Sequence, residues 1–251
     1  MIFLITGCSS YIAKHVTRKL LADGNRVIGV SRTDPNIEYE DFSWITHDLS
    51  KGSCALDTSS VDIIIHMAAQ SLLNKSAEEY LNSNILITNP VGNMAKKLQP
   101  KAIIYTSSIK VYGEIRAKEA TENIDIINPD LYGLTKYFGE KLLQEINPTI
   151  SLRMPGVVGV GSHGWIDGIY KKLKNNEALS IFNSPYNHVI HVLDIYGIIR
   201  QICDTEYFKT DFFNVCAGDL STSLEVVELI KEGLSSESVI DINEQDDGVT
   251  H

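Results

Sequence analysis

The sequence predicts an α/β protein built on a doubly wound parallel sheet, with a small C-terminal lobe. Two observations lead to this fold class. Short apolar runs alternate with amphipathic helical patterns through the first part of the chain, and those runs are continuously apolar rather than alternating. Continuous apolar strands belong in a parallel sheet that helices cover on both faces. With 251 residues the chain is long enough for one large domain with a modest appendage.

The first thirty residues predict a strand, a helix and a second strand. An apolar run over residues 2–5 ends at Thr6-Gly7. Apolar residues then recur at helical spacing from residue 12 to residue 21, where Asp23-Gly24 ends the helix. The β-rich run over residues 26–30 follows directly, so the chain opens with a β-α-β unit.

The same alternation continues downstream. Further strands are expected at residues 61–66, 102–106 and 150–154, and further helices at residues 76–98 and 130–146. Asn89-Pro90 should bend or interrupt the helix that contains it. A glycine-rich stretch over residues 156–164 then ends the pattern. We therefore expect a first domain over residues 1–155 and a small lobe over residues 156–251.

Charge and cysteine content exclude several classes of function. The 22 basic and 32 acidic side chains give a net charge of −10, which argues against nucleic acid and anionic membranes as partners. The four cysteines have no CxxC spacing, so neither a disulfide framework nor a metal site is expected. The apolar start of the chain, residues 1–5, is too short for a signal peptide or a membrane span. A reducing, cytoplasmic location is the expectation.

The turn after the first strand is the first candidate ligand site. A strand that leads directly into a helix points backbone N–H groups at an anion, as in dinucleotide-binding proteins. Three glycines usually shape that turn. Here Gly7 is present, and Ser10 and Ala13 stand at the other two positions. The turn alone is a weak signal.

A tyrosine and a lysine on the 130–146 helix supply a second signal. Tyr132 and Lys136 are four residues apart, so they share one face of the helix. A nearby ammonium favours the phenolate, so we expect Lys136 to lower the pKa of Tyr132 toward a range useful for proton transfer. The pair follows a predicted strand that ends in Ser107-Ser108.

Together these motifs resemble the extended short-chain dehydrogenase/reductases, and within them the NAD(P)-dependent nucleotide-sugar epimerase, dehydratase and reductase group. The resemblance covers nearly the whole chain. The matching segments, in order, are Thr6-Gly7 with Ser10 and Ala13, Asp48-Leu49, His66-Met67-Ala68-Ala69, Asn84-Ile85, residues 106–113, Tyr132 with Lys136, Arg153-Met154-Pro155, residues 191–194 and Phe213-Asn214-Val215.

The resemblance implies a Rossmann fold for residues 1–155, a substrate-binding role for residues 156–251, and roles for particular residues. Ser108, Tyr132 and Lys136 match the catalytic set. Ser108, Ile109 and His188 are the candidate substrate contacts. The candidate cofactor contacts are Gly7, Ser9, Ser10, Tyr11, Ile12, Arg32, Asp48, Leu49, Met67, Ala68, Ala69, Asn84, Tyr132, Lys136 and Pro155. Relatives also commonly form homodimers through two long helices.

The end of the second predicted strand bears on cofactor choice. NAD-binding proteins place an acidic residue there for the ribose 2′-hydroxyl, whereas this chain has Val30-Ser31-Arg32. An arginine offers a planar cation for a 2′-phosphate. We therefore predict a preference for NADP, with NAD as the alternative.

Three functions remain in view. The first is reduction of a 4-keto nucleotide-sugar by NADPH, based on Ser108, Tyr132, Lys136 and Arg32. The second is a nucleotide-sugar 4-epimerase with tightly bound NAD. The third is a non-catalytic cofactor sensor of the same fold, which the missing glycines favour and the intact Ser-Tyr-Lys set opposes. A 4,6-dehydratase is disfavoured because Ser107-Ser108-Ile109 replaces the acidic pattern of that branch.

Overall fold

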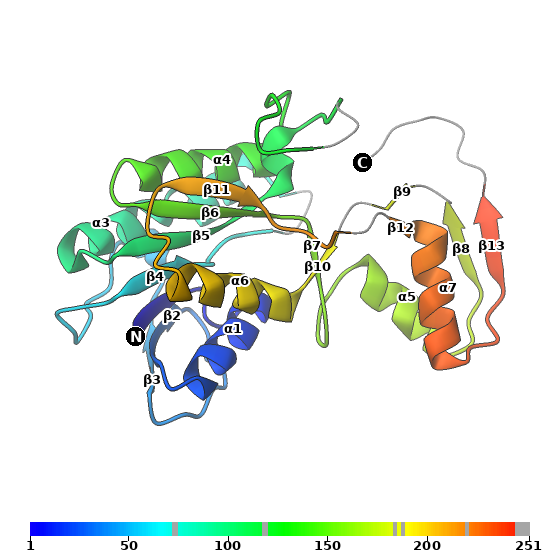
Figure 1. Cartoon of the computed structure of the whole chain (residues 1–251), viewed down its shortest axis with the longest axis horizontal. Helices are drawn as coiled ribbons and strands as arrows, with labels where there is room; N and C mark the ends of the chain where they lie inside the picture. Colours follow the sequence, from blue (N-terminus) through cyan, green and yellow to red (C-terminus); the bar gives the residue numbers. More distant parts are fainter. Residues whose placement is uncertain (72–74, 117–119, 183–184, 187–188, 219–220, 244–251) are drawn as a thin grey trace. The chain divides into compact units, whose positions relative to one another are not determined.

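A parallel sheet of seven strands, in the order β11-β6-β5-β4-β1-β2-β3, forms the centre of the computed structural model (Figure 1). Every pair of neighbouring strands in it runs parallel. The strands are β1 (Ile2–Thr6), β2 (Arg26–Ser31), β3 (Phe42–Thr46), β4 (Ile63–His66), β5 (Ala102–Ser108), β6 (Thr149–Met154) and β11 (Asp211–Asn214). The strand order reverses direction at β1, between β4 and β2, which is where sheets of this type bind ligands.

Helices cover both faces of the sheet. Helix α1 packs against α6 on one face, and α3 packs against α4 on the other (Figure 1). All residues of β4, β5 and β6 are buried, as expected for strands covered on both sides. The predicted fold class is confirmed. The α-helices of this part are α1 (Tyr11–Ala22), α2 (Ala77–Tyr80), α3 (Thr88–Leu98), α4 (Leu131–Gln144) and α6 (Val192–Asp204). Short helical segments of other types are η1 (Leu49–Lys51), η2 (Leu81–Ile85) and η3 (Ile109–Tyr112).

The helix predicted over residues 76–98 is interrupted, although not at Pro90 itself. It consists of α2, the π-helical segment η2, and α3. Pro90 lies in the first turn of α3, where backbone N–H groups have no partner inside the helix, so its missing N–H is tolerated. The break therefore precedes the proline.

Two strands of the sheet differ from the sequence expectation. Strand β3 was not expected, because Phe42–Thr46 is a half-exposed edge strand without a continuous apolar run. Strand β11 was assigned with residues 156–251, yet it pairs with β6 and forms the opposite edge of the sheet. Both edges are therefore less apolar than the centre.

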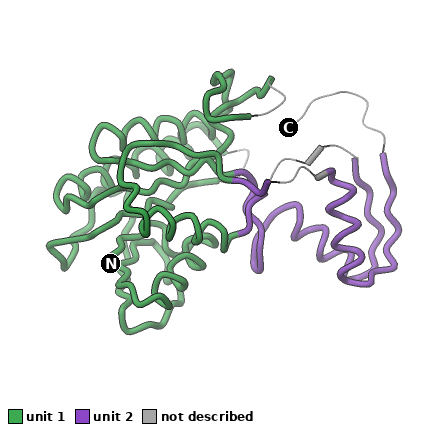
Figure 2. Tube along the Cα trace, in the orientation of Figure 1, with its two compact units in different colours: residues 1–154, 192–215 green, residues 155–191, 216–251 purple. Residues whose placement is uncertain are grey.

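The chain divides into two compact units (Figure 2). Unit 1 contains residues 1–154 and 192–215, and unit 2 contains residues 155–191 and 216–251. The first crossing lies between residues 154 and 155, next to the expected division into residues 1–155 and 156–251, and residues 192–215 return to unit 1, so the units are interleaved. The reason is long-range, since α6 packs on α1 and β11 extends the sheet.

Unit 2 is built from short strand pairs and two helices. Strand β8 pairs with β13, β7 with β10, and β9 with β12. A small apolar core forms between α5, α7 and the β8–β13 pair, with Leu173, Ile181 and Val227 at its centre. The elements are β7 (Gly156–Val158), α5 (Trp165–Lys174), β8 (Leu179–Phe182), β9 (Pro185–Tyr186), β10 (Val189–His191), β12 (Ser221–Thr222), α7 (Ser223–Leu234) and β13 (Ile240–Asn243).

The structure describes residues 1–71, 75–116, 120–182, 185–186, 189–218 and 221–243. Within these ranges no helix combines the length and apolarity needed to cross a bilayer. The same ranges contain no group of three or more His, Cys, Asp or Glu side chains placed to hold a metal ion.

Two helical glycines of unit 1 provide a test of packing. A Cβ on Gly133 in α4 would lie 2.1 Å from the Lys110 carbonyl oxygen, whereas one on Gly197 in α6 meets no described heavy atom within 4 Å. Gly133→Ala should therefore lower the free energy of unfolding by about 1–3 kcal/mol, because α4 must move away from η3. Gly197→Ala should raise it by up to about 1 kcal/mol through helix propensity.

Urea denaturation followed by circular dichroism would measure both variants. A Gly133→Ala variant as stable as Gly197→Ala would contradict the close packing of α4 on η3.

Candidate functional site

A cavity of about 390 Å³ lies in unit 1 at the carboxyl ends of β1, β2 and β4. This is the switch point of the strand order, where a doubly wound sheet opens a crevice. The lining residues are Gly7, Ser9, Ser10, Val30, Ser31, Arg32, Thr33, His47, Asp48, Leu49, Ser50, Met67, Ala68, Ala69, Gln70, Asn82, Ser83 and Ile87.

The turn from β1 into α1 forms one wall of this cavity. Gly7 has a φ of +71°, and a Cβ there would lie 2.7 Å from the Ala68 backbone, so only glycine fits. Ser10 is the N-cap of α1, and its side chain makes no capping hydrogen bond within the described part of the chain. The first turn of α1 also carries no acidic residue. Its N–H groups and positive dipole end therefore suit an anion such as a pyrophosphate.

The end of β2 forms the adjoining wall. The Ser31 hydroxyl donates to the Thr33 carbonyl at 2.7 Å and accepts from Trp44 Nε1 at 3.0 Å, and the Cys8 thiol lies 3.1 Å away. The Ser31 hydroxyl thus makes its hydrogen bonds within the protein. Its neighbour Arg32 also lines the cavity.

His47 and Asp48 complete this end of the cavity. His47 Nε2 bonds the Gly52 carbonyl at 2.8 Å. The Asp48 carboxylate accepts from the Ser50 N–H at 3.0 Å. Hydrogen bonds from Ser50, helped by the charge of Arg32, lower the pKa of Asp48. The wall therefore holds both signs of charge next to one another.

These residues fit a dinucleotide. The glycine turn, the open N-terminus of α1 and the polar wall from Arg32 to Asp48 are the features that hold a pyrophosphate and an adenosine. Nine of the expected cofactor contacts line the cavity, namely Gly7, Ser9, Ser10, Arg32, Asp48, Leu49, Met67, Ala68 and Ala69.

The other expected contacts lie elsewhere. Tyr11 and Ile12 begin α1, Asn84 lies in η2, Tyr132 and Lys136 lie on α4, and Pro155 follows β6 as the first residue of unit 2. None of them is among the lining residues of the described cavity. The lining residues that the sequence did not indicate are Val30, Ser31, Thr33, His47, Ser50, Gln70, Asn82, Ser83 and Ile87. Most of these directly adjoin an indicated residue, so a wider window around each motif would have found them.

The three expected catalytic residues come from two neighbouring elements. Ser108 ends β5 and caps η3, where its Oγ accepts from the Lys110 N–H at 3.2 Å. Tyr132 and Lys136 lie on α4, which packs against β5 and η3. The Tyr132 phenol lies close enough to Ser108 for the serine side chain to lower its pKa. The structure therefore brings Ser108 and Tyr132 together.

The electrostatics of this pair differ from the sequence expectation. Burial raises the pKa of Tyr132 to about 12, with the negative charge of Asp130 adding to it and Ser108 opposing it. The expected lowering of the Tyr132 pKa is wrong for the protein alone, because burial is the largest influence on this phenol. Lys136 is itself fully buried, and its Nζ lies 4.2 Å above the Tyr105 ring. Burial lowers the pKa of Lys136 to about 7.

Asn84 connects the cavity wall to the helix that carries Tyr132. Its Oδ1 accepts from the Gln70 N–H at 2.7 Å, and its Nδ2 donates to Thr135 Oγ1 at 2.9 Å. Thr135 in turn donates to the Tyr132 carbonyl at 2.8 Å. Asn84 therefore links Gln70 to α4 by hydrogen bonds.

His66 begins a second buried chain of hydrogen bonds. Thr88 Oγ1 donates to the Asn84 carbonyl at 2.7 Å, so it accepts from His66 Nε2 at 3.3 Å. Burial keeps this imidazole neutral, so His66 Nδ1, 2.6 Å from Thr6 Oγ1, accepts from that hydroxyl. The neutral ring then carries its proton on Nε2. Burial, with a smaller contribution from the charge of Lys136, lowers the pKa of His66 to about 3.

The substrate contacts expected from the sequence cannot all be placed. Ile109 is the first residue of η3, directly after Ser108. His188 lies outside the described residues. Neither His66 nor Thr135 was indicated as a functional residue, because their importance comes from hydrogen bonds between segments far apart in the sequence.

The buried His66 predicts how stability depends on pH. An unfolded histidine titrates at about pH 6.5, whereas folded His66 has a pKa of about 3 and stays neutral above it. Below about pH 6.5 the unfolded chain binds a proton that the folded chain does not, so the free energy of unfolding falls as the pH falls through this window. His66→Gln should make that pH dependence shallower.

Urea midpoints of wild type and His66→Gln, taken across this pH range, would measure the difference between the two slopes. Parallel slopes would mean that His66 is not the buried neutral group described here.

The sequence also matches a known family. A family model described as the NAD dependent epimerase/dehydratase family matches residues 3–216. A putative UDP-glucose 4-epimerase of Methanocaldococcus jannaschii is 25% identical over 262 residues, covering 95% of this chain and 85% of that protein. A UDP-glucose 4-epimerase of Dictyostelium discoideum is 26% identical over 281 residues, covering 93% and 81%.

Solved structures of similar fold agree with the architecture. A UDP-glucuronic acid 4-epimerase from Bacillus cereus, solved in complex with NAD, superposes with a TM-score of 0.82 at 20% identity, covering 97% of this chain and 87% of that chain. The enzyme WbmG of Bordetella bronchiseptica, also in complex with NAD, gives a TM-score of 0.85 at 21% identity, covering 99% and 83%. At these identities the likeness establishes the fold.

Proposed function

We propose that this chain, which belongs to the NAD dependent epimerase/dehydratase family, is a nucleotide-sugar 4-epimerase that uses a bound nicotinamide dinucleotide. One observation carries the proposal. The neighbouring side chains Ser108 and Tyr132 lie on the packed elements β5 and α4, in the same unit as a cavity suited to a dinucleotide. A proton-transfer pair beside a hydride carrier is what reversible oxidation of a sugar hydroxyl requires.

Epimerisation is favoured over the reduction that the sequence first suggested. Several relatives that align over most of this chain carry the name UDP-glucose 4-epimerase, one of them as a putative assignment. No reductase is among the relatives described above. The intact Ser108, Tyr132 and Lys136 also disfavour a role as a cofactor sensor without catalysis. By the same relatives, a UDP-sugar is the substrate class we propose.

In this proposal each residue has one task. Ser108 donates a hydrogen bond to the reacting sugar oxygen, since its Oγ already accepts from the Lys110 N–H. Tyr132 exchanges a proton between its phenol oxygen and that sugar oxygen. With its pKa raised to about 12, Tyr132 holds its proton firmly when no further positive charge is near. Proton removal therefore needs added positive charge close to the phenol.

The chain's own residues also hold the cofactor in this proposal. The first turn of α1 binds the pyrophosphate, and the wall from Arg32 to Asp48 binds the adenosine. A bound nicotinamide supplies a reversible acceptor for the hydride of the sugar carbon. Asn84 keeps Gln70 on the cavity wall in register with α4, so cofactor and Tyr132 stay aligned.

Removal of the Tyr132 hydroxyl tests the mechanism. Tyr132→Phe should reduce turnover about 10²–10⁴-fold, because proton exchange at the sugar oxygen is lost. Dinucleotide affinity should stay within about twofold of wild type, since Tyr132 does not line the described cavity. Tyr137→Phe, the same change one residue after Lys136, serves as the matched control and should keep full turnover.

The assay should follow interconversion of C4 epimers of UDP-sugars with no cofactor added, and in parallel consumption of NADPH with 4-keto nucleotide-sugars. Full turnover by Tyr132→Phe would contradict the mechanism. Epimer formation without cofactor consumption supports the epimerase, and NADPH oxidation supports a reductase of 4-keto nucleotide-sugars.

The second candidate is an NADPH-dependent reductase of a 4-keto nucleotide-sugar, and the wall at the end of β2 favours it. Ser31 replaces an acidic residue there, and Asp34 is turned to the Asn36 N–H at 2.8 Å. Arg32 therefore presents its cation to the cavity beside the hydroxyls of Ser9 and Thr33, which bond each other at 3.0 Å. This set suits a 2′-phosphate.

Dissociation constants for NADPH and NADH test this cofactor preference. Wild type should bind NADPH the more tightly, and Arg32→Ala should weaken NADPH about 10–100-fold while leaving NADH nearly unchanged, because one charge-assisted contact is lost. Arg26→Ala, at the exposed start of the same strand, is the control. Equal affinities for both cofactors in wild type would overturn the preference.

Assembly and location stay predictions. We keep the homodimer and the cytoplasmic location as expectations from the sequence. Size measurement in solution would decide the first.

A further inference from the structure

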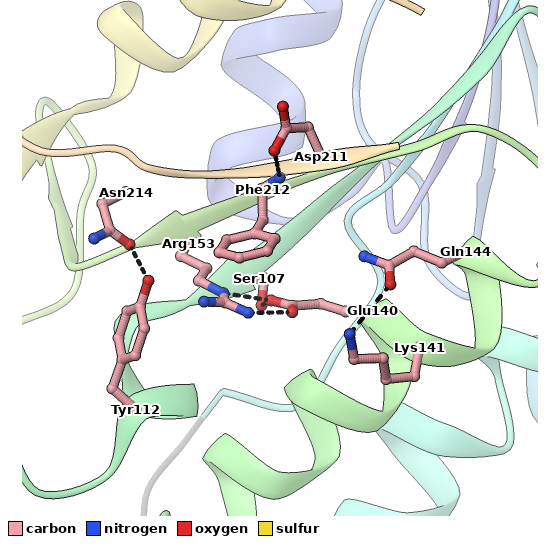
Figure 3. A network of polar contacts seen from close by, with 9 residues as sticks. All are labelled: Ser107, Tyr112, Glu140, Lys141, Gln144, Arg153, Asp211, Phe212 and Asn214. Carbon is pink, nitrogen blue, oxygen red and sulfur yellow. Dashed lines mark hydrogen bonds and ion pairs between the residues drawn. The ribbon is translucent and has the colours of Figure 1, made fainter. Parts of the chain in front are cut away.

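Glu140 lies at the centre of a buried polar cluster on the face of the sheet that α4 covers (Figure 3). Its Oε1 accepts from Ser107 Oγ at 2.5 Å and from Arg153 Nε at 3.0 Å, and its Oε2 accepts from a terminal nitrogen of Arg153 at 2.7 Å. Glu140 is completely buried and Arg153 is 3% exposed. The geometry is a two-point ion pair with an added hydroxyl donor.

Arg153 is fixed from both sides. Its guanidinium carbon lies 4.0 Å from the Phe212 ring centre and 4.8 Å from that of Tyr112. The Tyr112 phenol donates to Asn214 Oδ1 at 2.7 Å (Figure 3). The cation therefore has no room to turn away from Glu140.

The cluster spans three strands at one level of the sheet. Ser107 of β5 stands opposite Arg153 of β6, and Arg153 stands opposite Asn214 of β11. Ser107 immediately precedes Ser108. Anything that fixes Ser107 against α4 therefore also fixes where Ser108 stands relative to Tyr132.

Glu140 is also one helical turn beyond Lys136 on α4. Lys136 and Arg153 are two buried basic side chains; Glu140 forms an ion pair with Arg153, and its charge raises the pKa of Lys136. In surroundings this dry a neighbouring charge acts strongly. The carboxylate is held by Arg153 and Ser107, so its negative charge stays at a fixed distance from Lys136.

We propose that Glu140 is a positioning residue for the Ser108–Tyr132–Lys136 set: its fixed carboxylate favours the charged form of Lys136 in a buried site and holds the end of β5 against α4. The catalytic consequence rests on the proposed function, whereas the charge state of Lys136 does not.

The groups around Lys136 are consistent with this role. Tyr105 lies below its Nζ at 4.2 Å, and neutral His66 stacks on Tyr105 with ring centres 5.3 Å apart. Tyr105 and Tyr132 are both kept protonated, since burial raises the pKa of each phenol. Glu140 is the neighbouring charge that raises the pKa of Lys136 against the lowering effect of burial.

A cationic Lys136 matters because Tyr132 must release a proton in the proposed reaction. A neutral Lys136 would leave the buried phenol without local positive charge. Glu140 thus acts on Tyr132 through Lys136 and through the position of Ser108, without contact to substrate.

Titration of Lys136 by NMR tests the proposal directly. Protein labelled with ¹³C at lysine Cε would be titrated without cofactor, and Lys136→Met would assign the signal. In Glu140→Gln the Lys136 midpoint should fall by about one pH unit, because a nearby anion is lost. Glu145→Gln removes an equal charge from the exposed C-terminal end of α4 and should leave the midpoint unchanged.

A second variant keeps the test decisive if Glu140→Gln does not fold. The double variant Glu140→Gln with Arg153→Met leaves no unpaired buried cation. Its Lys136 midpoint should fall as well, since Glu140 is the charge that acts on Lys136.

The direction of the shift separates positioning from mere packing. A loosened structure would admit water and raise the midpoint toward the usual lysine value. An unchanged or raised midpoint in the folded variants would therefore overturn the proposal. In turnover assays the same shift should appear in the pH dependence of kcat. The NMR titration needs no turnover, so it tests the proposal even if the protein lacks the proposed activity.

Discussion

The parallel direction of all seven strands is the constraint on which the rest of the structure depends. Because the strands run the same way, their carboxyl ends meet at one edge of the sheet, and the chain can leave that edge only through turns and helix starts. Gly7, Arg32 and Met67 follow β1, β2 and β4 and reach one cavity. Ser108 ends β5 at the same edge, where α4 brings Tyr132 to it. The cavity and the Ser108–Tyr132 pair thus lie at the same edge of the sheet.

Several polar groups buried behind this edge are held by hydrogen bonds to distant segments. His66, Asn84 and Glu140 each use their donors and acceptors on partners from other segments. Burying such groups is unfavourable unless every bond is made, so each network tolerates few alternative arrangements. Burial also shifts the pKa values of Tyr132 and Lys136 away from their values in water. The same burial that makes the site rigid therefore sets its proton chemistry.

Much of the fold follows from local pattern, and much of the site does not. The apolar runs of β1, β2, β4, β5 and β6 are readable because both faces of each strand are covered. Strand β3 is not, since half its residues face outward. The motif residues near Gly7, Asp48 and Ala68 reach the cavity as expected. The raised pKa of Tyr132 and the role of Glu140 depend on burial and on contacts between distant segments, which no local spacing records.

The return of residues 192–215 to unit 1 has a consequence for the order of synthesis. Strand β6 leaves the ribosome with one side of its ladder unpaired, and it stays an open edge until β11 has been made. Phe212, which stacks on Arg153, arrives only then. A nascent chain that has completed the first 154 residues therefore carries an exposed strand and an arginine that lacks one of its two aromatic neighbours, a state that favours edge-to-edge association. The first half of unit 2 must emerge before that edge closes.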